Sequence, residues 1–231
     1  MVLTLYSVSD GPPSLAVRMG LKLFNLNYNL VEVDFASGEH LKQDYAKKNP
    51  QKEIPTLDDD GFLLSESVAI LQYLADRYGV QHHNVYPTDP KKRAVINQRL
   101  AFNIASYYKN IAEYVMAPIF FDYERSPVGL KKVKAVLDVF NNILQNEGKL
   151  YAAGDSLTIA DLLLISATLC LEAINFDLNE YKYISKWYDN FKIEQPSLWK
   201  IAEEGMNEIK QFNENPPLLP DLDHPIHPTR R

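Results

Sequence analysis

The chain has 231 residues, of which 46% are hydrophobic and 23% charged, so it is long enough and apolar enough to bury a full core. Its formal net charge is −6 at pH 7, without a long block of either sign. This argues against nucleic acid as a partner, because phosphate binding needs a basic surface. The single cysteine, Cys170, excludes an internal disulfide and a paired-cysteine redox motif.

The N-terminal residues MVLTLYSVSD lack the basic start and the cleavage site of a secretory signal, so we expect a cytoplasmic protein. The most apolar segment, residues 157–174, contains Asp161 and Glu172. A membrane span needs roughly 20 uninterrupted apolar residues. This segment is therefore predicted to be a buried helix, and we expect no membrane partner.

The first part of the chain alternates between strand and helix patterns. Residues 2–6 (VLTLY) alternate as a strand, and from Pro12 to Leu26 apolar residues recur every three or four positions, as in a helix. The patterns that follow are a strand over 29–35, a helical stretch over 38–49, an Asp-Gly hairpin over 54–67 and a helix over 65–79. Residues 1–80 are thus predicted to form an α/β domain.

The rest of the chain shows helical patterns and no convincing strand. Residues 81–90 have the composition of a linker. Helices are predicted over residues 91–122, 127–147, 158–174, 181–193 and 197–213. Residues 91–213 therefore form a predicted all-helical domain, and residues 214–231 are so rich in proline that we predict a loop or a disordered arm.

Three segments, in this order, resemble the cytosolic glutathione transferases. NPQKEIPTL (49–57) is similar to the family's segment with a cis-proline, here Pro55, and SESVAILQYLADRYG (65–79) is similar to its Glu-Ser helix start. LTIADLLL (157–164) resembles the buried helix of the family's second domain, with a capping box from Thr158 to Asp161.

Within the family, GEHLKQDYAKKNPQ (38–51) and PTDPKKRAVINQRLAFN (87–103) look most like the insect delta and epsilon classes, or an unclassified insect class. The resemblance implies a thioredoxin-like N-terminal domain that binds glutathione and an all-α C-terminal domain that binds the second substrate. It implies glutathione as co-substrate and no metal.

The resemblance also assigns the two ends of the glutathione site. Ser67 would lie at a helix N-terminus, where unpaired N–H groups and the helix dipole attract a carboxylate, and Glu66 can pair with the ligand's amine. Lys52 stands where the insect classes usually have a histidine, and as a point charge it should preserve binding with less pH sensitivity. The other expected glutathione-binding residues are Gly11, His40, Ile54 and Pro55.

The group that activates the glutathione thiol is less clearly assigned. In delta and epsilon enzymes a serine at the start of the first helix bonds the sulfur and favours the nucleophilic thiolate. An ungapped alignment puts Gly11 at that position. Three alternatives remain open: Tyr6, Ser9, or backbone N–H groups with the helix dipole. Pro12 and Pro13 lack N–H groups, which weakens the third alternative.

The stretch FNIASYYKNIAEYVMAPIFF (102–121) carries apolar and aromatic residues on more than one helical face. By resemblance, the electrophile pocket is lined by Tyr108, Ile111, Met116, Ile119 and Phe120. Such a pocket binds mainly by apolar area, so its selectivity should be loose. At Asn103 the family often has an aspartate, so this chain loses one charge at the domain interface.

The predicted activity is attack of the glutathione thiolate on a small apolar electrophile, or reduction of an organic hydroperoxide. The alternative function is a non-catalytic carrier of hydrophobic ligands with the same fold, which Gly11 makes more credible. A conjugation assay separates the two. Because the family's clefts open beside the subunit interface, we also expect a homodimer.

Overall fold

The computed structural model describes residues 2–230. Its first part is a mixed sheet with strand order β2-β1-β3-β4. The strands are β1 (Leu3–Ser7), β2 (Tyr28–Glu32), β3 (Thr56–Asp59) and β4 (Phe62–Ser65). β1 runs parallel to β2 and antiparallel to β3, and β4 runs antiparallel to β3. This topology confirms the predicted thioredoxin-like α/β domain.

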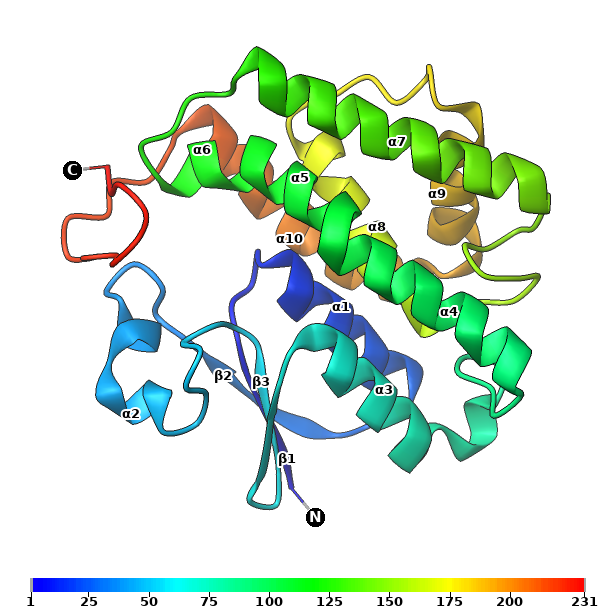
Figure 1. Cartoon of the computed structure of the whole chain (residues 1–231). Coiled ribbons are helices and arrows are strands. Elements are labelled where there is room, and N and C mark those ends of the chain that lie inside the picture. Colours follow the sequence, from blue (N-terminus) through cyan, green and yellow to red (C-terminus); the bar gives the residue numbers. More distant parts are fainter. Residues whose placement is uncertain (1, 231) are drawn as a thin grey trace.

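Helices cover this sheet and form the rest of the chain (Figure 1). Those of the first domain are α1 (Pro12–Leu23), α2 (Gln43–Ala46) and α3 (Ser67–Tyr78), with short 3-10 turns at Glu39–Leu41 and Gly79–His82. Those of the second domain are α4 (Pro90–Phe102), α5 (Tyr108–Tyr114), α6 (Met116–Phe120), α7 (Pro127–Glu147), α8 (Ile159–Ala173), α9 (Lys182–Glu194) and α10 (Pro196–Glu214). The helix α1 packs against α3, α8 and α10, so it joins the two domains.

Two helical predictions need correction. The stretch 38–49 is a 3-10 turn and the short helix α2, because Lys42 between them has extended backbone angles. The predicted helix 91–122 is interrupted by a π-helical turn at Asn103–Tyr107 and again after Tyr114. Pro118 has no N–H for the carbonyl of Tyr114, and the side chain of Arg125 donates to that oxygen instead (3.2 Å).

The buried helix α8 begins at the predicted capping box. Asp161 is completely buried, and its Oδ2 accepts hydrogen bonds from the backbone N–H (2.9 Å) and the hydroxyl (2.8 Å) of Thr158. Its Oδ1 accepts from the N–H of Ala152 (2.8 Å) and from the indole of Trp187 (2.9 Å). One carboxylate therefore joins three segments of the helical domain. No helix within residues 2–230 has the length and apolar character that a membrane crossing requires.

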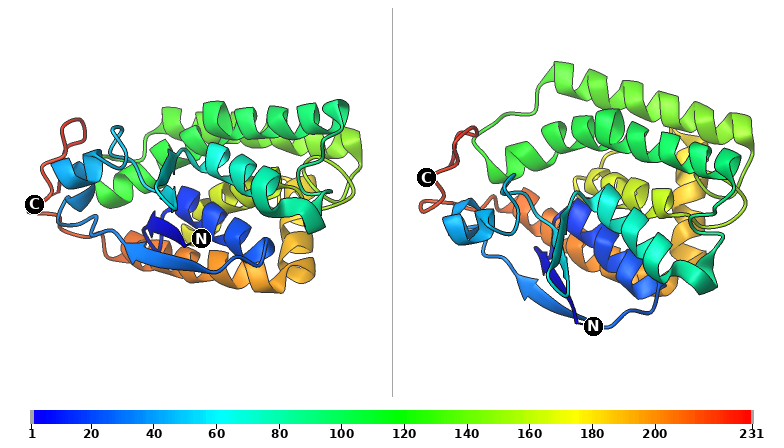
Figure 2. Two further views of the ribbon diagram at one scale, coloured as in Figure 1. Left: turned by 90° about the horizontal axis from the view of Figure 1, so that it is seen from below. Right: turned by 60° about the horizontal axis from the view of Figure 1, so that its bottom comes forward.

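Residues 216–230, called the tail below, contain no regular helix but are packed onto the molecule. Leu222 is completely buried, and Thr229 forms a β-bridge with Phe121. The guanidinium of Arg230 donates to three carbonyl oxygens at the end of α6, those of Pro118, Ile119 and Phe121, at 3.0 to 3.3 Å. Both views of Figure 2 show the tail, in red, beside α2 of the first domain. The tail thus bridges the two domains.

Candidate active site

Two adjoining cavities, of about 290 Å³ and 310 Å³, lie between the first domain and the helical domain. The first is also lined by the tail and is called the tail cavity; the second reaches the start of α3 and is called the α3 cavity. Both are lined by Pro12, Pro13, Glu53, Ile54 and Tyr108, which we call the shared wall. A ligand that fills both cavities must pass along this wall.

The α3 cavity is suited to a carboxylate and an amine. Ser67, the first residue of α3, lines it together with Glu66 and Pro55, and the first turn of α3 contains no acidic side chain. The N–H groups there and the positive end of the helix dipole can therefore bind an anion. The Glu66 carboxylate accepts a hydrogen bond from Gln51 (3.0 Å), and the bond between Ile54 and Pro55 is cis, as predicted.

The far end of the tail cavity contains His40 and Lys52. His40 is 4% exposed, and its ring stacks on Phe35 with centroids 4.7 Å apart. Its Nδ1 has no hydrogen-bond partner among the described residues. Burial, with His224 and Lys52 nearby, lowers the pKa of His40 to about 4. At neutral pH this end therefore offers one cation, Lys52, and one neutral imidazole with a free polar nitrogen.

We expect His40 to make the folded state sensitive to acid. Its ordinary pKa is 6.5 and its folded pKa about 4. Between these values the unfolded chain binds more protons, so stability is lost as the pH falls through this window. Urea unfolding at several pH values should show a flatter decline for His40→Gln, whereas the control His83→Gln should match the wild type. An equally steep decline in His40→Gln would contradict this explanation.

Three of the residues expected to bind the electrophile, Tyr108, Met116 and Phe120, form the apolar side of the tail cavity. The predictions for Ile111 and Ile119 are corrected by the structure: they are 0% and 1% exposed and line neither cavity. Both face the helical core, because α5 and α6 turn only one face toward the cleft. The aromatic wall is larger than predicted, since Phe35 and Phe121 also belong to it.

The loop before α1 does not place a side-chain hydroxyl in either cavity. Tyr6 of β1 contacts Tyr45 of α2 edge-on, with ring centroids 6.4 Å apart, and neither Tyr6 nor Ser9 lines the cleft. Gly11 does line it. A β-carbon at residue 11 would lie 2.6 Å from Cγ2 of Val8, so Val8 fills the space that a side chain there would need.

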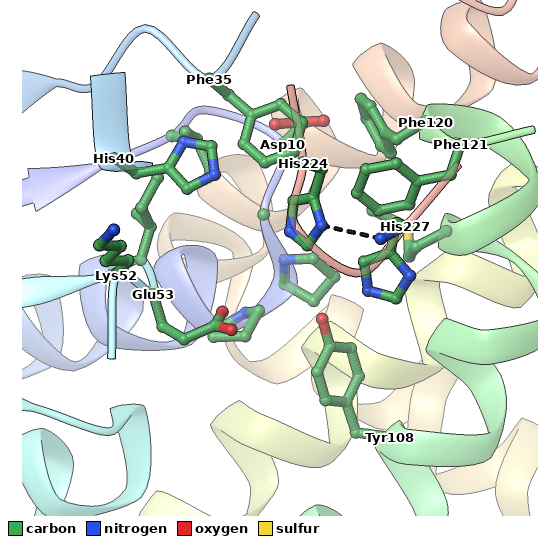
Figure 3. A pocket seen from close by; sticks show the side chains of 16 residues that line it. Asp10, Phe35, His40, Lys52, Glu53, Tyr108, Phe120, Phe121, His224 and His227 are labelled. Atoms are coloured by element: carbon green, nitrogen blue, oxygen red, sulfur yellow. Dashed lines mark hydrogen bonds between the residues drawn. The ribbon is translucent and has the colours of Figure 1, made fainter. Parts of the chain in front are cut away.

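Two carboxyl groups in the tail cavity, those of Asp10 and Glu53, were not predicted from the sequence. Burial, with Glu208 and Glu32 nearby, raises the pKa of Asp10 to about 6. Partial desolvation and the nearby Glu66 raise the pKa of Glu53, which is exposed at the cleft and points into it (Figure 3). Neither residue carries a sequence signal, because isolated acidic residues in loops are usually solvated. Within residues 2–230 no cluster of three or more ligand side chains could hold a metal ion.

The tail supplies two further groups to this cavity, His224 and His227. The ring of His227 stacks on Phe121 with centroids 4.4 Å apart, and its Nδ1 lies 3.2 Å from the hydroxyl of Tyr123. Figure 3 shows both imidazoles facing the cleft opposite His40. Both histidines belong to the motif HPIHP (224–228), but this local sequence does not predict where the tail packs.

A thioredoxin-like domain joined to a helical domain, with a polar groove beside an aromatic wall, defines a glutathione-dependent transferase. Two family descriptions match this sequence: "Glutathione S-transferase, N-terminal domain" over residues 1–76 and "Glutathione S-transferase, C-terminal domain" over residues 107–195. The chain belongs to the glutathione S-transferase family.

Solved structures of insect enzymes are similar to this chain. A diazinon-metabolizing glutathione S-transferase of the silkworm Bombyx mori is 53% identical, with 91% of this chain and 100% of that chain covered and a TM-score of 0.85. A delta-class enzyme of Nilaparvata lugens is 36% identical (92% and 98% covered, TM-score 0.86). Glutathione Transferase E6 of Drosophila melanogaster is 34% identical (92% and 96% covered, TM-score 0.83).

These similarities confirm the predicted resemblance to the insect delta and epsilon classes. They also confirm that the chain is a glutathione S-transferase with glutathione as its co-substrate. The alternative of a non-catalytic carrier is not favoured. All seven residues predicted to bind glutathione line one of the two cavities: Gly11, His40, Lys52, Ile54, Pro55, Glu66 and Ser67.

Proposed function

We propose that the enzyme conjugates glutathione to small aromatic electrophiles of xenobiotic origin. The observation that carries the proposal is the aromatic wall, which faces a groove with one polar site at each end. The wall consists of Phe35, Tyr108, Met116, Phe120 and Phe121. Because an apolar wall binds by area, it accepts a range of substrates of similar size.

The proposed orientation of glutathione follows from the charges in the cleft. The γ-glutamyl carboxylate binds at Ser67 and the helix N-terminus, and the amine binds Glu66. The glycyl carboxylate binds Lys52 and accepts a hydrogen bond from His40. This orientation leaves the thiol at the shared wall, facing the aromatic side.

The test is a conjugation assay with a generic aryl halide, followed by diazinon, which the silkworm relative metabolises. We expect the rate of aryl halide conjugation to saturate as the glutathione concentration rises. Larger apolar compounds should inhibit it by competing with the aryl halide. Retention on a glutathione column without any turnover would contradict the proposed reaction and favour a carrier.

We further propose that the enzyme is a cytoplasmic homodimer. On the edge strand β4, Phe62 is 51% exposed and Leu63 38% exposed, and such an apolar edge is usually covered. One chain has a mass of 26.4 kDa, and sedimentation equilibrium at micromolar concentration is expected to give twice that mass. A mass near that of a single chain would contradict the dimer.

A further inference from the structure

The loop before α1 offers few donors for a glutathione sulfur. Gly11 has no side chain, Pro12 and Pro13 have no N–H, and the hydroxyls of Tyr6 and Ser9 lie outside both cavities. A thiol needs a donor or a positive charge nearby to ionise at neutral pH. If glutathione binds in the proposed orientation, on which this inference rests, the donor must come from elsewhere in the cleft.

The tail brings a suitable donor to this place. The Nδ1 of His224 accepts hydrogen bonds from the backbone N–H groups of Ile226 (3.2 Å) and His227 (3.0 Å). A nitrogen that accepts these bonds does not carry the proton, so in the neutral ring the proton is on Nε2, at the opposite edge. Burial and the nearby His227 lower the pKa of His224, which favours this neutral form.

His224 lies where its imidazole can contact the sulfur of bound glutathione. Its imidazole faces the cleft opposite His40, and its ring centroid is 5.2 Å from that of Phe121. It therefore stands between the glycyl end and the aromatic wall, where a sulfur that faces the electrophile belongs (Figure 3). The other titratable groups that line this cavity are Asp10, His40, Lys52, Glu53, Tyr108 and His227.

We propose that Nε2–H of His224 donates a hydrogen bond to the thiolate of bound glutathione and replaces the hydroxyl that is absent at Gly11. A neutral imidazole stabilises the anion without competing with it for a proton. Arg230 acts as a positioning residue, since its three hydrogen bonds to the end of α6 fix the tail over the cleft.

The decisive variant is His224→Asn. Its side-chain oxygen can take the place of Nδ1 and accept the two backbone N–H groups, but nothing replaces Nε2–H. The pKa of the bound thiol, measured from the ultraviolet absorbance of the thiolate, should rise by about one unit. At neutral pH kcat/KM should fall about tenfold, with the glutathione KM nearly unchanged and the pH–rate profile moved to higher pH.

Arg230→Met should raise the thiol pKa in the same direction by a smaller amount, because the tail is loosened but His224 is retained. His83→Asn, outside the cleft, is the matched control and should leave the thiol pKa unchanged. Tyr108→Phe, Tyr6→Phe and Ser9→Ala should also leave it unchanged, because these hydroxyls are not the donors.

An unshifted thiol pKa in His224→Asn would overturn the proposal. The proposal would also be wrong if that variant raised only the glutathione KM, because His224 would then contact the glycyl carboxylate and not the sulfur. A shift of the thiol pKa in Tyr108→Phe, Tyr6→Phe or Ser9→Ala, with none in His224→Asn, would identify another donor and contradict it as well. Calorimetric binding of glutathione to the wild type is measured first, since no binding at all would contradict the proposed orientation itself.

Discussion

Replacement of Asp161 by alanine is expected to lower the free energy of unfolding by about 3–5 kcal/mol. The carboxylate accepts four hydrogen bonds from Thr158, Ala152 and Trp187, and without it these buried donors have no partner. The combined free-energy cost of leaving these donors unpaired exceeds the free energy gained by no longer burying the carboxyl group of Asp161. Burial raises the pKa of that group.

The measurement is equilibrium unfolding in urea, in which the midpoint should fall while the slope stays the same. Asp155→Ala is the matched control, because this exposed aspartate in the same segment makes only a surface ion pair with Lys149. The control should stay within about 0.5 kcal/mol of the wild type. A loss below about 1 kcal/mol for Asp161→Ala would show that the network is not a main support of the helical domain.

Replacement of Ser67 by alanine is expected to raise the glutathione KM by a factor of about ten to a hundred, because a hydrogen bond to a charged group is worth about 1.5–3 kcal/mol. The kcat should change little, since the γ-glutamyl end lies far from the sulfur and binds equally in the ground state and the transition state. Glu66→Gln should act in the same direction through the ligand's amine.

Steady-state kinetics with glutathione as the varied substrate measures this effect. Ser197→Ala is the matched control, because Ser197 also lies in the first turn of a helix but is exposed and outside the cleft. If Ser67→Ala lowered kcat and left KM unchanged, the α3 cavity would not be the γ-glutamyl site.

The residues that line the α3 end of the cleft could be predicted because their sequence signals are local. Glu66 is the residue before the amphipathic helix α3 and Ser67 is its first residue, and Pro55 precedes a hairpin, so a short segment determines both the local fold and which polar groups face the cleft. All the residues expected there do line the cleft. The capping box at Thr158 and Asp161 was predictable for the same reason, although its bond to Trp187 was not.

The rest of the site depends on contacts between distant segments. Residues 224 and 227 reach the cleft because the tail packs onto segments about a hundred positions earlier, through Arg230 and the Thr229–Phe121 bridge, and no periodicity encodes these contacts. Ile111 and Ile119 were wrongly expected in the cavity for a similar reason. Their apolar character was clear, but which helix face meets the cleft depends on the π-helical turn and on Pro118.

Glutathione is expected to span both cavities with its sulfur at the shared wall. The most direct test is a crystal structure of the full chain with glutathione bound. We predict the γ-glutamyl carboxylate at Ser67, the glycyl carboxylate at Lys52, and the sulfur within hydrogen-bond distance of Nε2 of His224. A sulfur bonded to Tyr6 or Ser9, or a peptide bound with its ends reversed, would contradict this account.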